Sequence, residues 1–338
     1  MRIMGAALVA AVVTLGLPAP ARAHHSAAAF DTQKEVTVTG SVAQYRFTNP
    51  HVYLTLDVKK DDGSTAKIEV EAGAASVLNG LGFSKNSISV GEVVRIVGNP
   101  SRNNPNAFIL GRDLYKQNGT YVPLNIASRS VYDAKNRSAT ATSIAGTWFA
   151  PRTEFGAFLG ATGRWSLTDK GKAASTNAVA RNNSLKDCVP LGAPALMLYP
   201  VADTITVQRD RVVMKVDWMD SERTVYLDGR KHPPASETFL QGHSVGRWEG
   251  TTLVVETTNF KDNAMGLSMA LPGSTQKRLT ERFALGDDRK TLLYSGVLED
   301  PTYLSQPVQW SSKLEYRPTM VHSNQKCDPE VARKFLQP

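Results

Sequence analysis

Apolar and polar residues alternate along most of this chain, which is the pattern of β-strands that bury one face. The alternation is clearest at residues 52–58, where every second position is aliphatic: Val52, Leu54, Leu56 and Val58. Beyond the first 23 residues, helical patterns are confined to short stretches at residues 73–82 and 168–181. We therefore predict a mainly all-β fold.

The first third of the chain carries five predicted strands, at residues 36–47, 52–59, 66–70, 92–98 and 107–115. A short predicted helix that ends at glycine, GAASVLNGLG, lies between the third and fourth strands. Three strands, a helix and two strands is the element order of an OB-fold barrel. We predict an OB-like five-stranded barrel at residues 24–123, with a small β-sandwich of the same elements as the alternative.

Residues 124–145 lose the alternation and are rich in serine, alanine, asparagine and threonine, which indicates a linker. About eight strand patterns follow between residues 204 and 316, separated by tight turns such as Asp228-Gly229. Such turns favour antiparallel neighbours. We predict an antiparallel β-barrel or curled sheet at residues 146–338, with a β-sandwich as the rival.

Residues 1–23 differ from the rest of the chain. Arg2 is followed by the apolar run GAALVAAVVTLGL and then by the small-residue ending Ala21-Arg22-Ala23. This order is typical of a signal peptide, here cleaved after Ala23, so we expect a periplasmic or secreted protein. No other stretch approaches the roughly 20 apolar residues of a membrane-spanning helix, and no membrane span is expected.

Composition and charge limit the classes of partner that this protein is expected to bind. Hydrophobic residues at 41% and charged residues at 21% are ordinary for a folded globular protein. The formal charge of +8 comes from scattered lysines and arginines, so we expect no nucleic-acid partner. The two cysteines, Cys188 and Cys327, form a predicted disulfide because an exported protein folds in an oxidising compartment.

Three of the six histidines lie in the first 51 residues, and they suggest a metal site: His24, His25 and His51. Cleavage after Ala23 leaves His24 as the N-terminal residue, whose amine and imidazole can chelate copper. His25 or His51 would complete a three-nitrogen site. The alternative is a mobile polar N-terminus with His51 hydrogen-bonded at a strand corner. Cleavage after Ala21 would keep copper binding with a different geometry.

A second candidate site lies at residues 242–250, where three glycines allow close approach of backbones. We predict that the polar and aromatic residues there line a ligand pocket at the mouth of the second barrel: His243, Arg247, Trp248 and Glu249. The alternative is an ordinary hairpin with Trp248 in the core. Ser244 forms no triad with His243, since neighbouring strand residues point to opposite faces.

Two groups of motifs resemble known families. The signal, His24-His25-Ser26, Phe30-Asp31, the Gly-x-Val of residues 40–42 and Thr48-Asn49-Pro50-His51 resemble an uncharacterised family of secreted bacterial proteins, catalogued as a domain of unknown function. The segments YLDGRKHPP at residues 226–234 and GHSVGRWEGTTLVVETTNF at residues 242–260 resemble another uncharacterised exported bacterial group. The second resemblance is imperfect, because Arg247 and Thr251 replace a histidine and an aspartate.

These observations favour an exported binding protein for a small-molecule ligand or a metal, with copper as the candidate metal. Nucleophile elbows, phosphate-binding glycine loops, H-E-x-x-H and haem-attachment motifs do not occur in the sequence. Two alternatives stay open. One is a hydrolase or isomerase with its site in the C-terminal β domain. The other is an envelope accessory module that binds a protein partner through the OB-like barrel.

Overall fold

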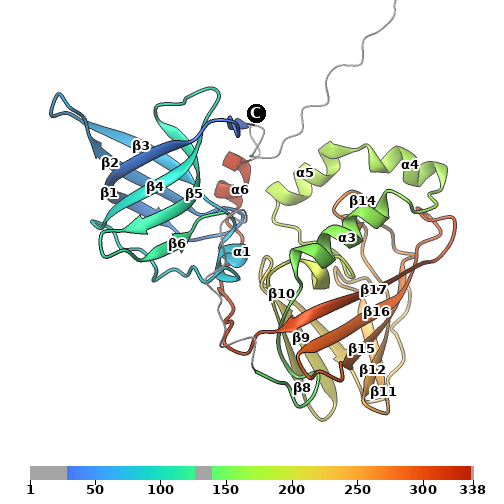
Figure 1. The fold of residues 1–338 in the computed structure, drawn as a ribbon. Coiled ribbons are helices and arrows are strands. Elements are labelled where there is room, and N and C mark those ends of the chain that lie inside the picture. The colour runs from blue at the N-terminus through green and yellow to red at the C-terminus, as the bar shows by residue number, and fades with distance from the viewer. Residues whose placement is uncertain (1–28, 126–138, 336–338) are drawn as a thin grey trace, which may run out of the picture.

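The computed structural model describes residues 29–125 and 139–335. It is mostly β and contains two barrels that lie beside one another (Figure 1). The predicted all-β class, with an OB-like barrel followed by a larger β-barrel, is confirmed. The predicted signal peptide and most of the predicted linker lie outside the described residues. Within those residues, no helix has the length and apolar character needed to cross a membrane.

The N-terminal barrel has the strand connections of an OB-fold. β1 pairs with both β2 and β4, and the parallel pairing of β3 with β5 closes the barrel. Its core is the aliphatic face predicted from the alternation, including Leu54, Leu56 and Ile96. The elements are β1 (Val36–Arg46), β2 (Tyr53–Lys59), β3 (Thr65–Glu71), α1 (Ala75–Asn79), β4 (Val93–Pro100), β5 (Phe108–Lys116) and β6 (Tyr121–Pro123).

The C-terminal barrel is closed, in the order β10-β11-β12-β15-β16-β17-β7-β8-β9. One of its pairings contradicts the expectation of antiparallel neighbours: β10 and β11 run parallel, joined only at Val225 with Ser244 and Tyr226 with Val245. The long connection at residues 227–242 lets the chain return in the same direction. The strands are β7 (Gly146–Phe149), β8 (Ala202–Val207), β9 (Arg211–Val216), β10 (Ser221–Tyr226), β11 (His243–Glu249), β12 (Thr252–Thr258), β15 (Arg278–Leu285), β16 (Thr291–Glu299) and β17 (Val308–Tyr316).

Helices cover one end of this barrel (Figure 1). The helix predicted at residues 168–181 is two helices, α4 (Asp169–Ser175) and α5 (Ala178–Lys186), with Thr168 and Asn177 as side-chain caps. α3 (Arg152–Thr162) was not predicted, because its two glycines and weak apolar face give little helical signal. α4 and α5 pack on the hairpin of β13 (Asn263–Ser268) and β14 (Leu271–Gly273).

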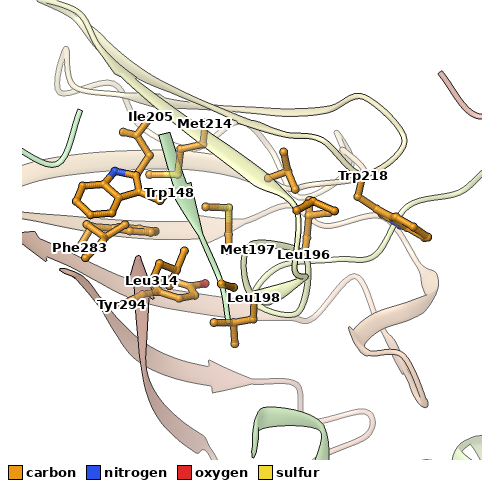
Figure 2. Packing of buried hydrophobic residues seen from close by; sticks show 14 of the residues in the cluster. Trp148, Leu196, Met197, Leu198, Ile205, Met214, Trp218, Phe283, Tyr294 and Leu314 are labelled. Carbon is orange, nitrogen blue, oxygen red and sulfur yellow. The ribbon is translucent and has the colours of Figure 1, made fainter. Parts of the chain in front are cut away.

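A large apolar cluster fills the C-terminal barrel. Trp148, Phe283 and Tyr294 are fully buried in it, and the 3-10 helix η2 (Leu196–Leu198) inserts its side chains from the covered end. Figure 2 shows Met197 and Leu198 of this helix among the surrounding barrel side chains. Burial of this apolar surface is the main source of stability for the barrel.

The last described segment connects the two barrels. After β17 the chain passes along the C-terminal barrel and ends in α6 (Pro329–Phe335), which lies between the barrels (Figure 1). Cys327 of this segment forms the predicted disulfide with Cys188, which follows α5. The same segment forms an ion pair with the OB-like barrel, in which Asp328 lies 2.7 Å from Arg46.

Candidate functional site

Of the three predicted copper ligands, the described residues include only His51. His24 and His25 lie outside the described residues. The Nδ1 atom of His51 lies 2.8 Å from the carbonyl oxygen of Ala72 and 3.1 Å from the carboxylate of Glu71. This nitrogen is therefore engaged within the barrel, so a metal would have to bind His51 through Nε2. In residues 29–125 and 139–335, no three His, Cys, Asp or Glu side chains converge as metal ligands would.

The Thr48–His51 motif has a structural use. Asn49 is completely buried, and its Oδ1 accepts hydrogen bonds from the backbone and hydroxyl of Ser76 in α1. Its Nδ2 donates to the carbonyl oxygen of Gln325 at 2.9 Å. The backbone of Asn49 also forms a bridge with Cys327. The motif thus joins the OB-like barrel to the C-terminal segment.

The four predicted pocket residues all lie on β11, but at its two ends. At the hairpin tip, Arg247 forms ion pairs with Glu249 at 2.9 Å and with Glu256 at 2.8 Å, and all three side chains are exposed. Trp248 is 41% exposed, so it does not pack in the core as the hairpin alternative required. His243, at the first position of β11, is separated from this exposed cluster by the length of the strand.

His243 instead meets a residue that the sequence analysis did not single out. Its Nδ1 lies 3.0 Å from the Nδ1 of His232, which belongs to the YLDGRKHPP segment. The ring of Tyr226 stacks on His243, with centroids 5.3 Å apart and an interplanar angle of 25°. The guanidinium of Arg230 lies 3.7 Å from the centroid of the Tyr226 ring. The two motif segments that resemble one exported group therefore meet at this histidine pair.

The loop that carries His232 is held by Asn259. Its Nδ2 donates to three backbone carbonyls of that loop: Pro233 at 3.2 Å, Pro234 at 2.9 Å and Glu237 at 2.9 Å. On the other side, Gly242 has a φ of +72°, and a Cβ there would lie 2.6 Å from Thr257. Only glycine fits at that position without strain. Both histidines therefore come from segments with fixed backbones.

Burial lowers the pKa of His243, and the neighbouring His232 and the positive charge of Arg230 lower it further. The negative charges of Asp228 and Glu237 oppose this shift. His243 is accordingly a neutral imidazole at neutral pH, with a nitrogen lone pair available to accept a proton or to bind a ligand.

Two pockets flank the histidine pair. The seam pocket, of about 490 Å³, opens where the start of β10 has no β11 partner, and it is lined by Met219, Arg223, Tyr226, Phe239, Gln241 and His243 among others. The second pocket, of about 720 Å³, is lined by residues that include His232, Asn259, Lys277 and Asp300. His243 faces the first pocket and His232 the second.

Gln241 is the unsatisfied polar group of the seam pocket. The residue is 91% buried, and its Nε2 donates to the carbonyl oxygen of Leu191 at 2.8 Å. None of the described residues donates a hydrogen bond to its buried Oε1. Burying a carbonyl oxygen without a hydrogen-bond donor costs folding free energy. A ligand that donates a hydrogen bond to this atom would remove that cost.

A charged network lies at the inner end of the seam pocket. Arg223 pairs with Glu281 inside the barrel, and its Nε donates to Ser244 Oγ at 3.1 Å. Tyr294 donates to the same glutamate at 2.7 Å, and burial raises the pKa of Tyr294 well above its usual value. Ser244 therefore points into the barrel, away from His243, as strand alternation predicted.

Lys277 is the buried amine of the second pocket. Its side chain is fully buried, and its Nζ donates to the carbonyl oxygens of Ala193 and Gly266. Burial lowers the pKa of Lys277 to about 7, although the nearby Glu281 opposes the shift. The buried amine is therefore held by two backbone carbonyls.

No curated protein matches the chain. A model of a family described as a family of unknown function (DUF6152) matches residues 11–108, which contain the Thr48–His51 motif but not the C-terminal barrel. The histidine pair and both pockets therefore lie outside the matched residues. What the match establishes is that the N-terminal part of this chain, residues 11–108, is similar to an uncharacterised family of unknown function.

Proposed function

We propose that this chain is an exported binding protein whose C-terminal barrel takes a small planar ligand in the seam pocket. The observation that carries the proposal is Gln241, which lines the pocket and whose buried Oε1 accepts no hydrogen bond from any described residue. Leaving such an atom unpaired costs about 1–3 kcal/mol, and a ligand N–H or O–H group would remove this cost.

The remaining walls favour an aromatic ligand. Phe239 is 42% exposed at the pocket edge, and its ring centroid lies 6.1 Å from that of His243. Tyr226 continues the same row of rings on the other side of His243. Because His243 and Arg230 already cover the ring of Tyr226, the exposed ring of Phe239 is the apolar surface on which an aromatic ligand can stack. The ligand class is therefore an aromatic ring that carries one hydrogen-bond donor.

A hydrolase or isomerase reaction is the second candidate function. The neutral His243 is favoured for it, because a general base must be unprotonated near the working pH. The described neighbours of His243 include no serine or cysteine nucleophile bonded to it, and Ser244 is bonded inside the barrel. Binding without chemistry is therefore the better supported proposal.

Two isosteric probes test the binding proposal. Indole carries an N–H donor, whereas benzofuran has an oxygen at the same ring position. Ligand-observed NMR titrations of the full chain should show that indole binds about five- to tenfold more tightly, as expected for one hydrogen bond of about 1 kcal/mol. The Gln241→Met variant should lose this preference. Gln309→Met, on the exposed face of β17, is the matched control and should keep it.

The proposal is wrong if indole and benzofuran fail to bind the folded wild-type protein at millimolar concentration. It is equally wrong if Gln241→Met retains the preference for indole. Phe239→Ser should weaken both probes alike, because it removes the stacking surface and leaves the acceptor in place.

A further inference from the structure

His232 and His243 are placed as the two ligands of a metal ion would be. They come from different segments, the loop after β10 and the start of β11, yet their Nδ1 atoms lie 3.0 Å apart. Two nitrogens that bind one ion at about 2.0–2.1 Å are separated by about 2.9 Å at a right angle and about 3.3 Å in a tetrahedron. The observed separation lies between these values.

We propose that the two Nδ1 atoms of His232 and His243 hold a divalent late transition-metal ion, with its other coordination positions open toward the pockets. Imidazole nitrogen suits zinc and copper, whereas magnesium and calcium prefer oxygen ligands. This site is distinct from the N-terminal copper site suggested by His24, His25 and His51, and it does not depend on an organic ligand in the seam pocket.

The surroundings hold both rings in place before an ion arrives. Asn259 fixes the loop of His232 through three backbone carbonyls. Tyr226 stacks on His243, and the ring of His232 meets that of His243 edge to face at 5.1 Å. Such outer contacts raise metal affinity because the ligands lose little freedom on binding.

The protons of the pair can be rearranged without a net charge change. One Nδ1 donates to the other in the absence of metal, since two lone pairs cannot share a hydrogen bond. For an ion to bind, the donating ring moves this proton to its own Nε2 through solvent. Both rings then stay neutral, and both Nδ1 lone pairs face the ion.

Charged side chains near the histidine pair both favour and oppose the binding of a cation there. Asp228 and Glu237 lie close enough to act on His243 and favour positive charge there, whereas Arg230 opposes it. The carboxylate of Asp228 is already paired with Arg230 at 2.5 Å. The pair therefore supplies two protein ligands, and we assign the remaining positions to water.

Isothermal titration of the full chain with zinc chloride and with copper sulfate tests the proposal. The titration is carried out in a His24→Ala/His25→Ala background, which removes the N-terminal chelate. Magnesium chloride is the negative control. One equivalent of zinc or copper should bind. His232→Gln and His243→Gln should each weaken binding about tenfold or more, as loss of one of two ligands requires. His51→Gln is the histidine control and should bind like the background protein.

Zinc-edge anomalous diffraction from the background protein gives a second, independent readout that does not depend on the folding of the His232→Gln and His243→Gln variants. The expected result is a single peak close to both Nδ1 atoms. A peak elsewhere, no peak, or equal affinity in the background protein and in the folded His232→Gln variant would overturn the proposal. Indole binding in the absence of metal is measured separately, so failure of one proposal is distinguishable from failure of the other.

Discussion

Asn49 donates a hydrogen bond to the backbone carbonyl of Gln325, a residue 276 positions later in the chain. The donor lies at the corner of the OB-like barrel, and the acceptor belongs to the segment that follows the last strand of the second barrel. One buried amide thus links the beginning of the described chain to its end. This contact gives Asn49 of the Thr48–His51 motif a structural role.

Substituting Asn49 should destabilise the protein markedly. Asn49→Leu keeps the volume but leaves the Gln325 carbonyl and the Ser76 hydroxyl without this partner, at a cost of about 2–4 kcal/mol in the free energy of unfolding. Urea unfolding followed by circular dichroism measures it. The exposed Asn86→Ala is the control and should change the free energy by less than about 0.5 kcal/mol. Equal effects of the two substitutions would contradict the buried role.

The disulfide should contribute strongly to stability. Cys188 and Cys327 are 139 residues apart in sequence, and a cross-link that closes such a loop adds about 4–5 kcal/mol in the chain-entropy model. A Cys188→Ala/Cys327→Ala variant should therefore melt well below the oxidised wild type. Two alkylatable thiols in the unreduced native protein, detected by mass spectrometry, would show that the bond does not form.

The buried pair of Arg223 and Glu281 should behave as a coupled unit. Glu281→Gln leaves the arginine charge without its partner inside the barrel and should cost about 3–5 kcal/mol. Replacing both residues, as Arg223→Met/Glu281→Leu, should restore most of that loss because no charge then stays buried. A double-mutant cycle from denaturant unfolding tests this, and additive effects would show that the two residues do not interact.

Lys277 should make stability rise with pH. Its pKa is about 7 in the folded protein and 10.5 in an ordinary lysine, so the unfolded chain binds the additional proton between these values. Stability therefore increases as pH rises from 7 toward 10.5, by about 3 kcal/mol at most over the first 2.5 units. In Lys277→Met this increment should disappear. Unfolding free energies of both proteins at pH 7 and pH 9.5 provide the comparison, and parallel changes would contradict the shifted pKa.

The sequence alone determined the local features of this protein. Strand alternation, as at Leu54 and Leu56, depends only on neighbours along the chain, because successive side chains of a strand point to opposite faces. The strand and helix order was enough to predict an OB-like barrel. The pairing of Cys188 with Cys327 followed from there being only two cysteines in the chain.

Only the tertiary structure decided which distant segments meet. His232 and His243 are brought together by a loop whose conformation no local sequence pattern specifies. The sequence pattern therefore grouped His243 with Arg247 and Glu249 of the same strand and did not predict its contact with His232. The parallel pairing of β10 with β11 has the same origin, since a long connection leaves strand direction to packing in the whole barrel. The seam pocket opens where that short pairing stops. The buried Oε1 of Gln241, to which no described residue donates, could therefore be recognised only in three dimensions.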